Sequence, residues 1–387
     1  MLVSILRLSP GRRLCRLPSC LLLLLGRHGV PLVHGSEPYP ARVGDLPLRN
    51  SPQVEEGGVV PAADLVLEGG GLKGLGGAGA VLGLMAQGYT FPRVAGTSAG
   101  AIVGAFVAAG ATATRLEQLM SELDYRKVPD RSGFKLPLLS EGLSLFLDGG
   151  AYEGDYIHNW LRTELKALGV ETFGQLRRAD PDDDVNLPIH QRYKLVVTAT
   201  DVTRGRLLRL PWDYEQFGLD PDTQLVADAV RASMSIPLYF EPQQLRNSQT
   251  GETSTIVDGG VLTNFPVEIF DRTDPRPRRW PTFGVRIMPD MPPAGGGGLL
   301  PGWLTPKPLH LVEQVITTAI VGHDQTYVDR PCVRKRTITV DTSPVGVVEF
   351  GASAAQREQV STNGRRAAAE FLSTWDWDAY RAHCPAG

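Results

Sequence analysis

The sequence predicts an α/β protein in three layers, an α/β/α sandwich whose central sheet is largely parallel and has helices on both faces. Two observations predict this class: two strand–turn–helix units follow each other directly, and apolar β-branched runs then alternate with helical patterns. The first unit consists of a strand at Leu65–Leu67, a glycine turn and a helix at Leu72–Gln87. The second consists of a strand at Arg93–Gly96, a turn at 97–99 and a helix at Ala101–Ala109.

The rest of the chain continues this alternation. Runs of β-branched and apolar residues predict further strands, at Tyr193–Thr200, Thr255–Val257, Thr282–Met288 and Thr337–Val340. Apolar residues at helical spacing predict helices between them, at Tyr156–Leu168, Gln224–Arg231, Leu309–Val321 and Ala354–Leu372. Strands that alternate with helices favour parallel pairing, because a helix carries the chain back to the start of the next strand.

Composition excludes some classes of protein. A hydrophobic content of 42%, a charged content of 21% and a net charge of -3 are typical of a soluble globular protein and give no basis for nucleic-acid binding. The cysteines Cys15, Cys20, Cys332 and Cys384 are scattered, so we expect neither a disulfide framework nor a zinc site, and a reducing compartment is favoured. The acidic run Asp180–Asp184 lacks the glycine and terminal glutamate of a calcium loop, and we expect no metal and no cofactor.

The first 62 residues differ from the rest, because they lack sustained periodicity and are rich in arginine, proline and glycine. We expect a poorly ordered leader over residues 1–62, a main domain over 63–375 and a C-terminal tail over 376–387. The apolar run Leu21–Leu25 resembles the core of a signal peptide but is short, and no stretch reaches the roughly 18 apolar residues of a membrane span. A cytoplasmic or peripheral membrane location is expected, with export left open.

The glycine turn after the first strand reads LEGGGLKG and admits three functional interpretations. Gly69, Gly71 and Gly74 match the G-x-G-x-x-G pattern of a dinucleotide site, and a nucleotide-binding oxidoreductase is one hypothesis, but no Asp or Glu lies between Glu68 and Glu117 to bind a ribose. A P-loop would need its lysine after the last glycine, whereas here the lysine precedes it. The third interpretation is an oxyanion hole built from backbone N–H groups, and the structural alternative is a turn that only lets helix and strand pack closely.

The second turn reads Gly96-Thr97-Ser98-Ala99-Gly100 and fits a G-x-S-x-G elbow. Such an elbow holds its serine on a strained strand-to-helix turn, and Gly96 and Gly100 would give the crowded backbone room. Ser98 would then lie at a helix N-terminus, where partial positive charge favours an oxyanion. This pattern favours a serine nucleophile over an ordinary turn because a predicted strand precedes it and a predicted helix follows it.

A serine nucleophile needs a base, and the sequence offers two kinds. An α/β-hydrolase would use an acid followed by a histidine, with His310 or His323 as candidates, but only one convincing strand precedes Ser98 and that fold needs several. The other candidate is Asp258, which ends an apolar strand and is followed by Gly259 and Gly260. A carboxylate is a weak base at its usual pKa of about 3.9, so a Ser-Asp dyad requires burial that raises this value.

Four stretches in order resemble the patatin-like phospholipase family, and together they extend from Leu65 to Val267: Gly69–Gly74, Gly96–Gly100, Ala229–Pro242 (AVRASMSIPLYFEP) and Asp258–Gly260 with Asn264-Phe265-Pro266. The resemblance implies an α/β sandwich, a catalytic domain at 63–375, and hydrolysis of acyl esters of lipids by a phospholipase A or lysophospholipase type of activity without a metal. It implies that Ser98 is the nucleophile and Asp258 the general base. The oxyanion hole would be formed by Gly69, Gly70, Gly71, Leu72, Lys73 and Gly74.

The partner implied by this resemblance is a phospholipid or another acyl-ester lipid, with transient contact to a membrane surface and no nucleic acid. Two apolar segments could line an acyl groove or form a flap, although core packing is the favoured interpretation for most of their residues. The first contains Phe134, Leu136, Leu138, Leu139, Leu143, Leu145, Phe146 and Leu147, and the second Leu299, Leu300, Trp303 and Leu304. A third hypothesis is a scaffold that keeps the fold without catalysis.

Overall fold

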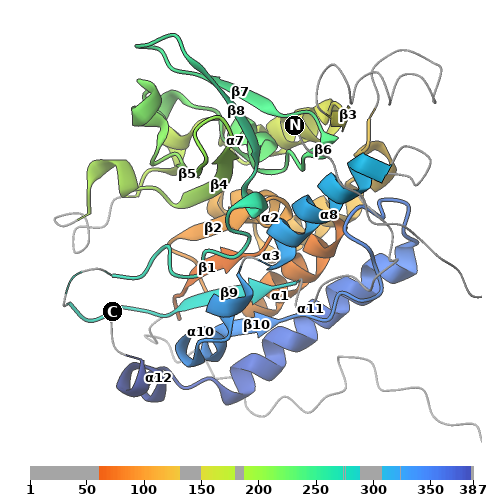
Figure 1. Cartoon of the computed structure of the whole chain (residues 1–387). Helices are drawn as coiled ribbons and strands as arrows, with labels where there is room; N and C mark the ends of the chain where they lie inside the picture. Colours follow the sequence, from red (N-terminus) through yellow and green to blue (C-terminus); the bar gives the residue numbers. More distant parts are fainter. Residues whose placement is uncertain are drawn as a thin grey trace, which may run out of the picture. The chain divides into compact units, whose positions relative to one another are not determined.

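The computed structural model describes residues 61–130, 150–178, 187–272, 274, 276–287, 307–322 and 324–384. Residues 1–60 of the predicted leader, the acidic run Asp180–Asp184 and the two apolar segments at 134–147 and 299–304 lie outside these residues. Figure 1 shows a central sheet with helices packed on both sides, so the predicted fold class is confirmed.

The central sheet has the strand order β10-β9-β1-β2-β4-β8-β7, with β5 paired to β4. Pairing is parallel from β10 to β4 and antiparallel for β5, β8 and β7. The strands are β1 (Asp64–Leu67), β2 (Val94–Thr97), β4 (Leu195–Asp201), β5 (Arg206–Leu210), β7 (Gln243–Arg246), β8 (Thr253–Asp258), β9 (Thr282–Arg286) and β10 (Thr337–Thr339). A small second sheet pairs β3 (Gly150–Tyr152) with β6 (Leu238–Phe240).

The two strand–turn–helix units form as predicted. In the first, the 3-10 turn η2 (Gly71–Lys73) leads from β1 into α1 (Gly74–Ala86), and in the second β2 leads into α2 (Ala99–Ala108). Small residues on both helices permit close packing: a Cβ on Gly100 would overlap the carbonyl of Leu67 in β1. The same holds for α1 against α11 (Ala354–Thr374), because a side chain on Gly79 would overlap the carbonyl of Ser361.

Other helices surround these units. Three were predicted with nearly these bounds, α5 (Asp155–Ala167), α7 (Val226–Ser233) and α8 (Lys307–Gly322), whereas α3 (Ala113–Glu122), α9 (Gln325–Val328), α10 (Pro331–Lys335) and α12 (Trp377–His383) were not predicted. The start of α3 has a clear local signal, because the Thr112 hydroxyl accepts the N–H of Arg115 at 3.2 Å as an N-cap. No helix in the described ranges is both long enough and apolar enough to cross a bilayer.

Our expectation for the cysteines and for residues after 376 needs correction. Cys332 in α10 forms a disulfide with Cys384, which directly follows α12. Trp377 and Tyr380 of α12 also pack their rings against Trp375 at the end of α11. The segment up to residue 384 is therefore attached to the domain rather than a free tail. The spacing gave no signal because the cysteines are 52 residues apart and meet only through the packing of two short helices.

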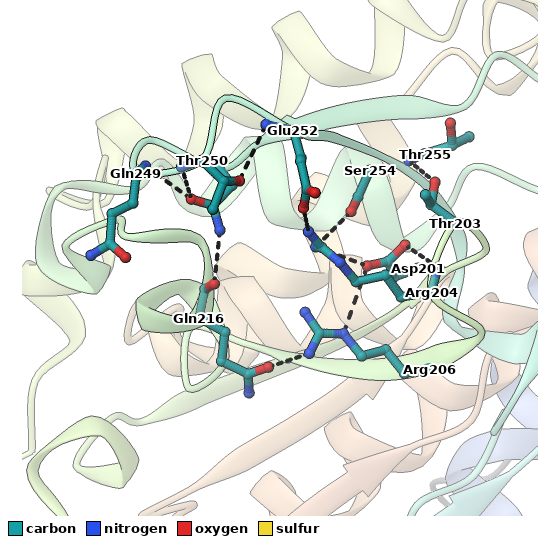
Figure 2. Close-up of polar contacts among 11 residues, drawn as sticks. Asp201, Thr203, Arg204, Arg206, Gln216, Gln249, Thr250, Glu252, Ser254 and Thr255 are labelled. Carbon is teal, nitrogen blue, oxygen red and sulfur yellow. Dashed lines mark hydrogen bonds and ion pairs between the residues drawn. The ribbon is translucent and has the colours of Figure 1, made fainter.

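A polar network fixes the antiparallel part of the sheet, at the turn that joins β4 to β5 (Figure 2). Asp201 at the end of β4 is fully buried, and its carboxylate lies 3.6 Å from Arg204 Nη1 and 3.7 Å from Arg206 Nε. Arg204 also donates to Ser254 Oγ in β8 at 2.8 Å and to Glu252 at 2.9 Å. These bonds tie the outer end of β4 to the start of β8, the strand that leads to Asp258.

Candidate active site

Ser98 occupies the single residue between β2 and α2. Its φ of +51° lies in the left-handed region, which is uncommon for a residue with a side chain and marks local strain. Gly96 makes this turn possible, because a Cβ there would overlap the carbonyl of Gly100. The backbone thus has the geometry of the predicted elbow, with the Ser98 side chain at the N-terminus of α2.

Asp258 reaches Ser98 by a different route from the one expected. A largely parallel sheet was predicted, but β8 runs antiparallel to β4. β4 extends beyond β2, and β8 pairs with that extension, so Asp258 lies opposite Ala199 while Thr97 lies opposite Thr198. The hydroxyls of Thr97 and Thr198 hydrogen-bond at 2.6 Å. Ser98 and Asp258 therefore approach the same level of β4 from its two sides.

The Asp258 carboxyl lies in a buried and sparsely hydrogen-bonded environment. Oδ1 accepts the N–H of Gly260 at 2.8 Å, whereas Oδ2 has no hydrogen-bond partner among the residues that the structure describes. Burial raises the pKa of Asp258 to about 7, against smaller lowering effects of the Ser98 hydroxyl and the Gly260 N–H. The Ser98 hydroxyl is thus near enough to lower the pKa of the carboxyl, although the two side chains form no hydrogen bond in the structure.

The glycine turn lies directly against Ser98, since a Cβ on Gly69 would come within 3.1 Å of the Ser98 Cβ. Its amides divide into two groups. Four of them already have backbone acceptors, namely Gly69 (Asn264 O, 3.3 Å), Leu72 (Val347 O, 2.9 Å), Lys73 (Gly70 O, 3.1 Å) and Gly74 (Gly71 O and Leu72 O). The amides of Gly70 and Gly71 have no acceptor in the described part of the chain.

Six residues were predicted to form the oxyanion hole, but only two of them, Gly70 and Gly71, have N–H groups without an acceptor among the described residues. Leu72 was expected to contribute its N–H, but that group is used by the carbonyl of Val347, which lies beyond the segment that carried the resemblance. Gly71 has a φ of +55°, and a Cβ there would overlap the same carbonyl. Only glycine fits this position, because both the backbone conformation and the close approach of Val347 exclude a side chain.

A comparison with protein-family models matches residues 65–271, more than half of the chain, to the model described as patatin-like phospholipase. The chain belongs to the patatin-like phospholipase family. The matched segment begins in β1, includes Ser98 and Asp258, and ends before β9.

Individual relatives of this patatin-like chain differ in how far they match. The uncharacterized protein YqhO of Bacillus subtilis (strain 168) is 41% identical over 227 residues, which cover 58% of this chain and 71% of that protein. Among solved structures, VipD from Legionella pneumophila is 18% identical with a TM-score of 0.43 and coverage of 81% and 67% of the two chains. ExoU from Pseudomonas aeruginosa, in complex with SpcU, is 19% identical with a TM-score of 0.42, and this chain spans about half of it (52%).

The sequence reasoning missed the role of the patatin-like segment Ala229–Pro242. Ser233 in α7 is buried and its Oγ accepts the N–H of Ser98 at 2.8 Å. The carbonyl of Ser235 accepts the N–H of Asp258 at 2.9 Å. The end of α7 therefore holds both residues by their backbones. The serine-rich sequence ASMS was a signal for such contacts, but it did not show which backbones the serines would meet.

Arg231 supports this segment from within the core. Its side chain is among the largest that are fully buried, and Nη1 donates to Ser235 Oγ at 2.7 Å while Nη2 donates to the carbonyls of Glu153 and Glu241. Burial lowers the pKa of Arg231 to about 10, and the nearby acidic side chain of Asp130 opposes that shift. A buried guanidinium that donates mainly to carbonyl groups fixes the position of the Ser233–Ser235 turn.

Asn264 is a further residue to which the sequence assigned no role. It is 2% exposed, and its Nδ2 donates to the carbonyl of Gly69 at 3.0 Å. Asp324 holds its backbone, because one carboxylate oxygen accepts the N–H groups of Asn264 and Phe265, both at 2.7 Å. The asparagine therefore connects the Asp-Gly-Gly turn with the glycine turn beside Ser98. Of the histidine candidates, the His310 side chain and His323 lie outside the described residues.

Proposed function

We propose that this patatin-like protein is a serine acyl hydrolase of lipid esters, of the phospholipase A or lysophospholipase type. Ser98 is the nucleophile and Asp258 the general base. The observation that carries the proposal is the pairing of a serine on a strained turn with a buried carboxyl whose free oxygen has no other partner in the described chain. Both side chains are buried, and the hydrogen bond from the Gly260 N–H to Asp258 Oδ1 uses only one of the two carboxyl oxygens.

In the acylation step, Asp258 Oδ2 takes the proton of the Ser98 hydroxyl as the oxygen attacks the ester carbonyl. The carbonyl oxygen becomes an oxyanion, and the N–H groups of Gly70 and Gly71 stabilise it, since these two amides of the turn have no acceptor among the described residues. The N-terminus of α2 adds positive potential at the same place. When the ester bond breaks, the proton held by Asp258 passes to the leaving alcohol, and Ser98 remains acylated.

The test compares the wild-type protein with Ser98→Ala and Asp258→Asn on a short-chain p-nitrophenyl ester and on phosphatidylcholine. Both substitutions are expected to abolish release of product above the background rate. Equal release by all three proteins would exclude the proposed dyad. A fluorophosphonate probe tests the scaffold hypothesis independently, because it labels only an activated serine.

The pH dependence of activity follows from the raised pKa of Asp258. A general base works only when it is ionised, so kcat/KM is expected to rise with pH and to level off above a midpoint near 7. An ordinary aspartate would give a midpoint near 4. The measurement is kcat/KM for a p-nitrophenyl ester from pH 5 to 9, with product quantified after quenching to one pH. A rate independent of pH between 5 and 8 would contradict this role of Asp258.

We also propose that α8 makes the contact with the lipid surface. Leu311 and Val315 are 64% and 60% exposed, lie one turn apart on the same face, and are joined there by Val312. α8 packs on η8 (Gly259–Val261), the turn that follows Asp258, and a Cβ on Gly260 would lie 3.3 Å from Ile320. An apolar helix face beside a site for lipid esters can insert into the acyl region of a membrane surface, and this is the partner that we assign to it.

Replacing Leu311 and Val315 together by aspartate is expected to lower hydrolysis of phosphatidylcholine vesicles by about tenfold or more, because the apolar burial at the lipid surface is lost. Hydrolysis of a soluble p-nitrophenyl ester should stay within about twofold. Ile189→Asp is the matched control, since Ile189 is equally exposed at 64% but lies in η5 (Ile189–Gln191). Unchanged vesicle hydrolysis in the double variant would refute the assignment of α8.

A further inference from the structure

Asn264 carries a buried acceptor that its structural contacts leave unused. Nδ2 donates to the carbonyl of Gly69, which identifies the other terminal atom as the oxygen, because two oxygens would repel each other there. That oxygen, Oδ1, is buried and has no hydrogen-bond partner among the described residues. A buried amide oxygen without a hydrogen-bond partner destabilises the fold, so its retention at this site calls for a functional reason.

The position of this oxygen places it within the proposed active site. A Cβ built on Gly260 would lie 2.9 Å from Asn264 Oδ1 and 3.1 Å from Asp258 Oδ1, so the amide and the carboxyl face the same glycine. A Cβ on Gly69 would overlap Asn264 Oδ1 and lie 3.1 Å from the Ser98 Cβ. Asn264 Oδ1 is therefore a close neighbour of both proposed catalytic residues, with glycines that leave space between them.

We propose that Asn264 is a further catalytic residue, which binds the water that deacylates Ser98. This inference rests on the proposed function. A water molecule has two hydrogens to donate, and the site offers two buried acceptors without partners in the described chain, Asn264 Oδ1 and Asp258 Oδ2. With both hydrogens bound, the lone pairs of the water oxygen stay free, and one of them can attack the acyl carbonyl.

The deacylation step balances with these groups alone. The water oxygen forms a bond to the acyl carbon while one proton passes to Asp258 Oδ2, and the carbonyl oxygen again becomes an oxyanion at the Gly70 and Gly71 amides. The bond from the acyl carbon to Ser98 Oγ then breaks, and Asp258 returns the proton to Ser98 Oγ. Asn264 accepts a hydrogen bond throughout and exchanges no proton. It acts only in this second step, because the first step consumes no water.

An exclusively structural role would have a different consequence. Through Nδ2 and its backbone, Asn264 also holds the glycine turn that stabilises the oxyanion in both steps. If that were its whole function, its loss would slow acylation and deacylation together. The two rates of one turnover therefore distinguish the roles.

The experiment follows p-nitrophenyl ester hydrolysis by Asn264→Leu in a stopped-flow instrument. Leucine has a similar volume and lacks both the Oδ1 acceptor and the Nδ2 donor, but the backbone bond from the Gly69 N–H to the carbonyl of residue 264 still holds the glycine turn. We expect the burst of nitrophenolate to keep its rate within about threefold, and the steady-state rate to fall roughly tenfold to a hundredfold, as for the loss of one hydrogen bond in a buried site. Acylated Ser98 should accumulate and be detectable by mass spectrometry of the intact protein. If Asn264→Leu does not melt cooperatively, Asn264→Ser carries the same expectation.

Asp324→Ala is the matched control, because it removes the acceptor for two backbone N–H groups of the same loop and leaves the Asn264 side chain in place. It is expected to slow both steps in similar proportion. Equal slowing of both steps by Asn264→Leu, or no slowing of deacylation, would overturn the inference. A wild-type protein that never forms acylated Ser98 would refute the proposed nucleophile itself, which is a distinguishable result.

Discussion

Replacing Ser98 with alanine is expected to lower turnover of a p-nitrophenyl ester by about ten-thousandfold or more. Removal of the nucleophile from a catalytic unit typically leaves only the acceleration that comes from binding and the oxyanion donors. The midpoint of thermal unfolding should stay nearly unchanged, because alanine removes only the hydroxyl, keeps the same Cβ at this strained position, and retains the backbone bond from its N–H to Ser233 Oγ. The measurements are kcat/KM and a melting curve.

The control for Ser98→Ala is Ser373→Ala, which removes an exposed hydroxyl near the end of α11 and should leave activity unchanged. A fluorophosphonate probe should label the wild-type protein and the control, but not Ser98→Ala. Labelling of Ser98→Ala at the wild-type rate would mean that another serine is the nucleophile.

Replacing Asp258 with asparagine is expected to lower kcat/KM at pH 8 by about a thousandfold or more, since the amide cannot accept the serine proton. The same substitution should stabilise the fold at pH 8. The folded-state pKa of about 7 lies above the unfolded value of 3.8, so the wild-type carboxyl favours folding fully below pH 4 and loses that contribution as pH rises through 7. Asparagine stays neutral and avoids this loss of up to about 4 kcal/mol at pH 8.

Thermal unfolding at pH 5 and pH 8 measures the second effect. The Tm of Asp258→Asn should exceed that of the wild type at pH 8, and the difference should shrink at pH 5, where the wild-type carboxyl is already protonated. Asp378→Asn is the control, because Asp378 is 82% exposed in α12 and no comparable gain is expected. A lower Tm for Asp258→Asn at pH 8 would contradict the burial cost inferred for the carboxyl.

Local signals made the first part of the fold predictable. Glycines between an apolar strand and an alanine-rich helix specify the two strand–turn–helix units, and they place Ser98 within one residue of its observed turn. The direction of β8 could not be predicted in this way. The direction of β8 depends on its pairing with the part of β4 that extends beyond β2. The buried Asp201 and the arginines that bind it hold that part of β4 in place, and the apolar pattern of β8 carries no information about them.

The sequence predicted which residues form the candidate site. It did not predict which of their N–H groups and oxygens lack a hydrogen-bond partner. Glycine repeats indicated which amides could bind an oxyanion, but the carbonyl that occupies the Leu72 amide comes from Val347, a residue far away in the sequence. Asn264 was visible only as part of a motif, because a free oxygen is defined by which neighbours it lacks in three dimensions. Whether an N–H group or an oxygen already has a hydrogen-bond partner depends on the tertiary structure, and motif spacing in the sequence does not predict it.

The support of the glycine turn by Val347 has a consequence for the architecture. The family match ends at residue 271, yet β1 pairs with β9 on one side, α1 packs along α11, and the turn itself is held by that carbonyl. All three supports come from the last third of the chain. We therefore expect that the shorter region, which contains both proposed catalytic residues, does not fold independently, because its expression alone would leave β1 as an open sheet edge and α1 without the helix that packs along it.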